Sequence, residues 1–195
     1  MNFRTRALTE DEFQKIISTL EMGYEYKGIQ HRPNRRVATA LATEATLGIR
    51  ISDVLNLRLS SIERDGDKHR LNIVEQKTGK SRTFVVNNDV YMYLKAYAFD
   101  CKLSEDQKLF DIRERQVQKI LRNVCEYLGL KGISTHSFRK LFATHIYENT
   151  HDIALIQKLL QHSSVTITQR YIGVPEQRIA DALSDTASLL GYVKK

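Results

Sequence analysis

The stretch Thr135-His-Ser-Phe-Arg-Lys-Leu-Phe-Ala-Thr-His145 decides how the rest of this 195-residue chain is interpreted. Ser134-Thr135 can cap a helix, which we expect over residues 136–148. His136 and Arg139 lie one helical turn apart and therefore share a face. The unpaired N–H groups and the dipole at the start of a helix also favour an anion. This stretch therefore predicts a site that can hold a phosphate.

Two shorter pieces follow, Leu159-Leu-Gln-His-Ser-Ser164 and Gln169-Arg-Tyr-Ile172. They add a second histidine, His162, and a phenol, Tyr171, which can attack phosphorus and later leave as phenolate. The chain holds nine tyrosines, however, and most of them must be core or surface residues. A lone His-x-x-Arg is also more often a solvated helix face. Catalysis therefore requires partners from other parts of the chain.

The composition favours a polyanionic partner. Lysine and arginine number 30 against 23 acidic residues, a formal charge of +7, although a merely soluble basic surface has the same balance. Cys101 and Cys125 lack the spacing of zinc ligands or of a disulfide framework, so we expect reduced thiols, no metal and no cofactor. No export signal or membrane-spanning apolar run is visible, which favours a cytoplasmic protein.

The remaining chain has mostly the apolar spacing of amphipathic helices. We expect helices over residues 10–22, from Pro33 to about Thr46, from Ser52-Asp53, and over 88–98, 114–128, 153–161, 165–172 and from Pro175. Residues 23–34 hold two glycines and a proline and are typical of a loop. Residues 70–86 alternate around Thr78-Gly79-Lys80 and predict a β-hairpin. The fold class is therefore mainly α with a small antiparallel β-sheet, in a single domain.

Three charged residues outside the opening stretch are candidates for the same site. Arg50 lies at a junction between helices, and Asp53 could hold its guanidinium by a charge-assisted bond. With Arg139, this arginine would form a clamp that neutralises charge growing on a phosphate in the transition state. Lys77, near the hairpin tip, can reach into a groove, although a solvated turn residue beside Lys80 is the alternative.

In these pieces the sequence resembles the catalytic domain of the tyrosine recombinases, or phage-type integrases. The matching pieces fall in the family's order and span residues 7–175: Thr46-Leu-Gly-Ile-Arg-Ile-Ser-Asp-Val-Leu-Asn-Leu57, Lys77-Thr-Gly-Lys80, Thr135–His145, Leu159–Ser164 and Tyr171. Each piece alone is weak, but five in order are specific. The resemblance implies the fold of the DNA breaking-rejoining enzymes.

The resemblance also implies a role for each matching residue. Arg50 and Arg139 would hold the scissile phosphate, with Asp53 as a supporting acid. His136 would assist proton movement at the nucleophile, and His162 would hydrogen-bond the phosphate or orient its neighbours.

The covalent step would fall to the remaining residues. Tyr171 would attack and leave a 3′-phosphotyrosine, while Lys77 would act as general acid on the departing 5′ oxygen. Because the ester stores the bond energy, the reverse attack needs neither ATP nor metal. Lys80 and Arg170 would contact DNA, although for Arg170 a solvated helix face is an equal alternative.

The implied partner is double-stranded DNA, bound by a homotetramer that passes through a Holliday junction, with a monomer in free solution and possible accessory DNA-bending proteins. The reaction would integrate, excise or invert a DNA segment, as in a mobile element. Residues 1–175 would form the catalytic domain, and 176–195 a C-terminal helix and tail that docks on a neighbouring subunit. We expect the family's N-terminal core-binding domain to be absent. Gln161 stands where the family usually has glycine.

Two other functions remain as alternatives. A type IB topoisomerase uses related chemistry to nick and reseal one duplex, but the spacing of His136 and Arg139 and the short chain argue against it. A basic helical DNA-binding module without catalysis would not require a phenol and two histidines in this arrangement.

Overall fold

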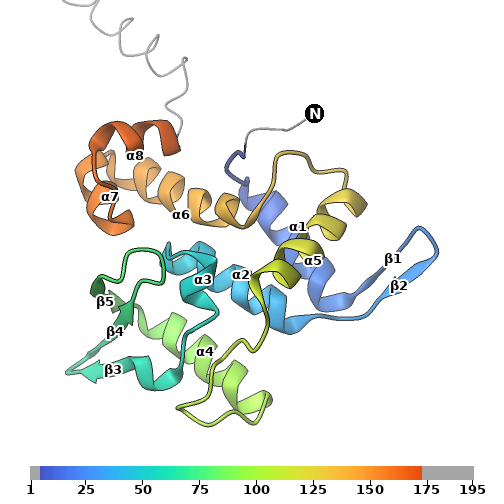
Figure 1. Cartoon of the computed structure of the whole chain (residues 1–195), viewed down its shortest axis with the longest axis horizontal. Helices are drawn as coiled ribbons and strands as arrows, with labels where there is room; N and C mark the ends of the chain where they lie inside the picture. Colours follow the sequence, from blue (N-terminus) through green and yellow to red (C-terminus); the bar gives the residue numbers. More distant parts are fainter. Residues whose placement is uncertain (1–4, 173–195) are drawn as a thin grey trace, which may run out of the picture. The chain divides into compact units, whose positions relative to one another are not determined.

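The structure, a computed structural model, describes residues 5–172 apart from the side chain of Arg170 (Figure 1). The chain divides into two compact units, of which the first ends at His145 and the second begins at Ile146. Helix α6 (Thr135–Thr150) contains this boundary. The helix predicted from Pro175 lies outside the described residues.

The first unit is mainly helical and holds two small sheets. Its helices are α1 (Glu10–Met22), α2 (Arg35–Leu47), α3 (Ile51–Val54), the 3₁₀ helix η1 (Leu59–Ser61), α4 (Asn88–Asp100), α5 (Glu114–Tyr127) and the first part of α6. Its strands are β1 (Tyr24–Tyr26), β2 (Ile29–His31), β3 (Ile62–Asp65), β4 (Lys68–Val74) and β5 (Ser81–Val86). The second unit contributes α7 (Ile153–Leu160) and α8 (Val165–Ile172). The predicted fold class is confirmed.

Local capping residues explain where the first helices begin. Thr9 and Glu12 form a capping box at α1, in which each side chain accepts from the other residue's backbone N–H. For α2, we predicted Pro33 as the first helical residue, which is wrong. Asn34 is the N-cap, because its side chain accepts a hydrogen bond from the Val37 N–H at 3.1 Å.

Residues 23–34 form a β-hairpin rather than the predicted loop. Strands β1 and β2 pair antiparallel, with Tyr24 opposite His31, and these two rings stack at 4.4 Å. Tyr24 also packs on Tyr127 of α5, with ring centroids 4.8 Å apart. Contacts between aromatic side chains, one of them far away in sequence, therefore stabilise strands of only three residues each.

The second sheet has the order β3-β4-β5 and is antiparallel throughout. Strands β4 and β5 form the predicted hairpin, with Leu71 opposite Phe84 and Val74 opposite Ser81. Strand β3 was not predicted and pairs with the other side of β4, where Ile62 faces Leu71. Residues 75–80 connect β4 to β5, so the turn that carries Lys77 projects from a three-stranded sheet.

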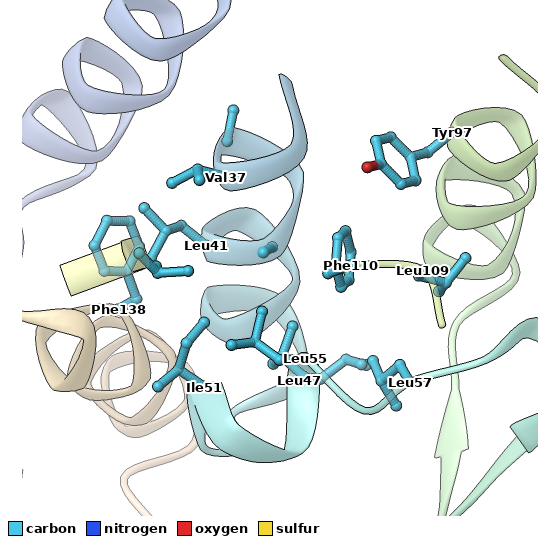
Figure 2. Packing of buried hydrophobic residues seen from close by; sticks show 14 of the residues in the cluster. Val37, Leu41, Leu47, Ile51, Leu55, Leu57, Tyr97, Leu109, Phe110 and Phe138 are labelled. Atoms are coloured by element: carbon cyan, nitrogen blue, oxygen red, sulfur yellow. The ribbon is translucent and has the colours of Figure 1, made fainter. Parts of the chain in front are cut away.

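The core of the first unit surrounds α2. Figure 2 shows Leu41 of α2 and Phe138 of α6 in one cluster of buried side chains, together with Phe110, which is fully buried. Replacing a leucine in such a core by alanine costs about 2–5 kcal/mol. Helix α2 and the start of α6 are therefore held rigidly by the core, and with them the positions of Arg50 and Arg139.

Helix α2 ends where it meets α6. Gly48 has a left-handed φ of 60°, and its N–H bonds the Glu44 carbonyl at 3.0 Å. A Cβ atom at Gly48 would lie 2.3 Å from the Phe142 ring, so only glycine fits. Within residues 5–172, no helix has the length and apolar character needed to cross a membrane.

Candidate functional site

Arg50 is the N-cap residue of α3 and follows closely on the end of α2. Its Nη1 donates a hydrogen bond to Oε2 of Glu75 at 2.8 Å, and 19% of the Arg50 side chain is exposed. We predicted that Asp53 would hold this guanidinium, which is wrong. Asp53 instead accepts a hydrogen bond from the Gln76 backbone N–H at 2.8 Å, so it supports the strand end next to Lys77.

Glu75 was not predicted as a site residue. It is 1% exposed and also accepts a hydrogen bond from the Thr78 hydroxyl at 3.0 Å. Burial raises the pKa of Glu75, but the hydrogen bonds from Arg50 and Thr78 and the charges of Arg50 and Arg82 outweigh burial. The pKa therefore lies below its usual value, and Glu75 is a carboxylate at neutral pH.

Arg139 projects from the first turn of α6 and is 3% exposed. Glu44 of α2, also buried at 1% exposure, lies near enough for the charge of Arg139 to affect it. Burial raises the pKa of Glu44 well above its usual value, and the charge of Arg139 offsets this only partly. The pKa of Glu44 therefore stays raised even beside the positive charge of Arg139.

The pKa of His136 is affected by several of the predicted cationic residues. Its side chain reaches the surface, yet the surrounding protein displaces enough water to lower its pKa. The charge of Arg139 lowers this pKa further, Arg50 and Lys77 add smaller effects of the same sign, and Glu114 opposes them. The first unit therefore brings four of the six predicted catalytic residues together, and the imidazole is neutral at physiological pH.

The second unit contains the other two predicted catalytic residues. His162 follows α7, and its Nδ1 lies 3.0 Å from the Thr168 hydroxyl, which is fully buried in α8. The rings of His162 and Tyr171 meet edge to face, with centroids 5.0 Å apart. Gln161, the C-cap of α7, has φ 53° and ψ 41°, the left-handed conformation that glycine adopts most easily.

The predicted general acid and the predicted DNA-contacting residues lie at the surface or outside the described part of the chain. Lys77 and Lys80 are both exposed in the turn between β4 and β5. Arg170 belongs to α8, but its side chain is outside the described residues. A cavity of about 230 Å³ opens beside the base of this turn, lined among others by Ser52, Gln76 and Glu114.

Sequence reasoning missed Glu44, Glu75 and Arg82, although each left a signal. Glu75 continues the side of β4 that carries Leu71 and Ile73, and Glu44 follows the apolar positions of α2. A charged residue at a core position is buried only with a partner or in its neutral form. Across residues 5–172, no three His, Cys, Asp or Glu side chains gather as they would around a metal ion.

Comparison with known proteins places these residues in a family. A model described as the phage integrase family matches residues 6–178. The probable integrase/recombinase YoeC of Bacillus subtilis is 35% identical over 167 residues, which cover 82% of this chain and 90% of that protein. The tyrosine recombinase XerA of Pyrococcus furiosus is 27% identical over 197 residues, which cover 95% of this chain and 63% of that one.

Solved structures show the same fold. The XerH recombinase bound to palindromic difH substrate matches with a TM-score of 0.73 at 19% identity, over 94% of this chain and 53% of that chain. The catalytic domain of bacteriophage HP1 integrase matches with a TM-score of 0.64 at 18% identity, over 93% and 95%. The chain thus spans about half to two thirds of XerH and XerA and most of YoeC and the HP1 domain.

Proposed function

The chain belongs to the phage integrase family, the tyrosine recombinases, and from this premise we propose that it breaks and rejoins DNA at specific sites through a covalent phosphotyrosine. One observation carries the proposal. Besides burial, the positive charges of Arg139, Arg50 and Lys77 all lower the pKa of His136, so three cations lie near enough to act on one imidazole. A DNA phosphate is the ligand that such a group would hold.

The two arginines hold the phosphate in this proposal. Arg139 starts from a helix N-terminus, where backbone N–H groups add to its charge, and Arg50 approaches from the N-cap of α3. Arg139 is buried and Arg50 is held by its ion pair with the buried Glu75, so both need little reorganisation as negative charge grows on the phosphate oxygens. Their planar forks suit the spacing of two phosphate oxygens.

The chemical step is an in-line displacement. The Tyr171 oxygen forms a bond to phosphorus while the bond from phosphorus to the 5′ oxygen of the next nucleotide breaks. The phenol proton passes to the neutral His136 or to water, and Lys77 gives a proton to the departing 5′ oxygen. The products are a 3′-phosphotyrosine and a free 5′ hydroxyl, which can attack in the reverse direction and reseal the strand.

His162 orients the nucleophile. The Thr168 hydroxyl fixes the rotation of the imidazole through its Nδ1, and the Tyr171 ring packs edge-on against the imidazole ring. Thr168 thereby controls how the phenol is presented. The same arrangement lets His162 donate to a phosphate oxygen when DNA is bound.

The substrate of this reaction is double-stranded DNA in a homotetramer, and the protein is a monomer before DNA binds. Three of the structurally similar proteins, the XerH recombinase, lambda integrase and the Tn1549 transposon integrase, are bound to DNA, which supports DNA as the partner. The reaction integrates, excises or inverts a DNA segment in the cytoplasm, with accessory proteins that bend the DNA. Residues 176–195, which we expected to dock on a neighbouring subunit, lie outside the described residues. The basic charge of +7 favours the same polyanionic partner.

Covalent capture tests this function and finds the DNA site in the same experiment. The protein is incubated with a library of short nicked duplexes whose centre is randomised, and adducts are isolated on a denaturing gel and sequenced. A nick beside the cleavage position lets the 5′ fragment diffuse away and traps the intermediate. We expect an adduct enriched in one sequence, with the 3′ end linked to Tyr171.

Two variants decide the result. Tyr171→Phe removes only the phenolic oxygen, so adduct formation should be lost completely. Tyr127→Phe, at an exposed tyrosine of α5, should leave it unchanged. An adduct of equal yield with Tyr171→Phe would disprove the assignment of the nucleophile, and the absence of any adduct with the wild-type protein would disprove the function.

A further inference from the structure

Glu75 connects two parts of the site that are far apart in sequence. It lies directly after β4 and two residues before Lys77, and it is almost completely buried. Its Oε2 accepts hydrogen bonds from Nη1 of Arg50 at 2.8 Å and from the hydroxyl of Thr78 at 3.0 Å. One oxygen atom is therefore shared between the arginine on α3 and the turn that carries the lysine.

The backbone of Glu75 closes the same turn. Its N–H donates to the Lys80 carbonyl at 3.0 Å, and its carbonyl accepts from the Gly79 N–H at 2.8 Å. The next residue, Gln76, donates its N–H to Asp53. The base of the turn is thus tied to α3 through two carboxylates, whereas Lys77 itself is exposed.

Arg82 adds a second positive charge on the other side of the carboxylate. Its Nη1 lies 3.7 Å from Oε1 of Glu75, and its side chain is 5% exposed. Burial lowers the pKa of Arg82 to about 10, and the charges of Arg139 and Arg50 contribute in the same direction, against Glu75. Glu75 is therefore a buried negative charge that interacts with both Arg50 and Arg82, and Asp53 adds a smaller effect of the same sign on Arg82.

We infer that Glu75 is a positioning residue, which couples the phosphate-holding Arg50 to the turn that carries the proton donor Lys77. The inference rests on the proposed function. Residues 76–80 of the turn are exposed and would otherwise place Lys77 loosely, because a long lysine side chain has many rotamers. When Arg50 binds a phosphate, its ion pair with Glu75 also holds the turn in place. The ammonium group of Lys77 is thereby positioned at the same phosphate.

The variant that tests this coupling is Glu75→Gln, which keeps the shape and removes the charge. The adduct assay is run on the captured DNA sequence, and we expect the rate of adduct formation to fall about 100-fold, the size of effect that a misplacement of about 1 Å can cause. Glu63→Gln, an exposed acid on β3 of the same sheet, is the matched control and should react at the wild-type rate.

A second substrate separates the lysine from the arginine. In a duplex whose 5′ bridging oxygen is replaced by sulfur, the leaving group departs as a thiolate and needs no proton. Lys77→Ala should recover nearly the wild-type rate on this DNA, and Arg50→Ala should not. Because Glu75 acts on both residues, the sulfur substrate should restore about half of the logarithmic loss in rate that Glu75→Gln causes on ordinary DNA.

Three results would overturn the inference. They are an unchanged rate for Glu75→Gln on ordinary DNA, a loss that the sulfur substrate does not relieve at all, and a loss that it relieves completely. If the sulfur substrate restores none of the rate, Glu75 acts through Arg50 alone. If it restores the whole rate, Glu75 acts through Lys77 alone. In each case the two halves are not coupled through this carboxylate.

A milder variant covers the case in which Glu75→Gln does not fold, as judged by thermal unfolding. Thr78→Val removes the hydroxyl bond between the turn and Glu75 but keeps the ion pair with Arg50. It should lose about tenfold in rate and regain it on the sulfur substrate; an unchanged rate would overturn the coupling.

The proposed function could also fail while the coupling holds. If the wild-type protein forms no adduct, a double-mutant cycle of Arg50→Ala and Glu75→Gln in denaturant unfolding still tests the pair. We expect non-additive effects, since both residues share one buried contact. Additive effects would disprove the contact on which the inference depends.

Discussion

The two halves of the predicted site are held in different ways. In the first unit, Arg139 is buried beside the core and Arg50 is ion-paired to a carboxylate that is itself buried. In the second unit, His162 follows the eight-residue helix α7 and Tyr171 lies in the eight-residue helix α8. The imidazole of His162 is hydrogen-bonded to the Thr168 hydroxyl and contacts the Tyr171 ring. The proposed phosphate ligands are therefore held by buried contacts, whereas the proposed nucleophile depends on a few local contacts.

The largest effect should come from the buried half. Arg139→Ala removes a preorganised charge and should cost about 3–4 kcal/mol of transition-state stabilisation, or roughly 10²–10³ in rate. Single-turnover adduct formation on the captured DNA measures this cost. Arg139→Lys keeps the charge but loses the planar fork, so it should recover only part of the rate. Undiminished cleavage by Arg139→Ala would show that the buried charge is not used.

In the second unit, the rate of adduct formation should depend on the hydroxyl group of Thr168. Thr168→Val removes the bond to Nδ1 of His162 but keeps the buried shape of the side chain. The loss of one hydrogen bond of about 1 kcal/mol should slow adduct formation roughly fivefold. Thr166→Val, at an exposed position of the same helix, serves as the control. Equal rates for the two variants would mean that Thr168 does not orient the imidazole.

A stability measurement tests whether the pKa of Glu44, near Arg139, is raised in the folded protein. The folded pKa of Glu44 lies above its unfolded value, so its contribution to stability is complete below the unfolded pKa, near 4.3, and is lost as the pH rises through the folded pKa. Glu44→Gln cannot ionise and should therefore be more stable than the wild type at neutral and alkaline pH.

Urea unfolding across pH checks this expectation for Glu44. The two proteins should have similar free energies of unfolding near pH 4 and diverge as the pH rises. The charged groups that act on this carboxyl are Arg139 of α6, which favours ionisation, and Glu114 of α5, which opposes it. A wild type more stable than Glu44→Gln at pH 8 would show instead that Glu44 is an ionised partner of Arg139.

The smallest effect should come from Gln161. This residue has a left-handed φ of 53°, which costs a side chain of ordinary kind about 1 kcal/mol relative to glycine. Gln161→Gly should therefore raise stability by up to about 1 kcal/mol, with the gain seen as slower amide hydrogen exchange in α7. A loss of protection there would show that the Gln161 side chain contributes more than its backbone conformation costs.

The sequence predicted most of the helices because their signals are local. Thr9 and Glu12, for example, lie in the same helical turn that they cap. The hairpin at 24–31 was missed because Gly28 within it and Gly23 and Pro33 beside it resemble a loop. The Tyr127 ring that packs on it comes from α5. Contacts between residues so distant in sequence leave no periodic pattern.

The family motifs indicated which charged residues gather in the first unit, whereas the acids that pair with them depend on packing and were missed. The motif residues Arg50, Lys77, His136 and Arg139 do meet in one unit. The partner of Arg50 was assigned to the neighbouring Asp53 because the two are close in sequence, and the inward position of Glu75 on the side of Leu71 and Ile73 was overlooked. Ion pairs follow the tertiary arrangement of strands and helices, and here the sheet brought the more distant acid to the arginine.

The contact between Gly48 and Phe142 has a practical consequence for this enzyme. Arg50 stands two residues beyond the glycine, and Arg139 stands one turn before the phenylalanine, so the separation of the two arginines is set by a backbone resting on an aromatic ring. Such a spacer is nearly incompressible and carries no charge. The separation of the two arginines should therefore be the same in dilute buffer and in concentrated salt.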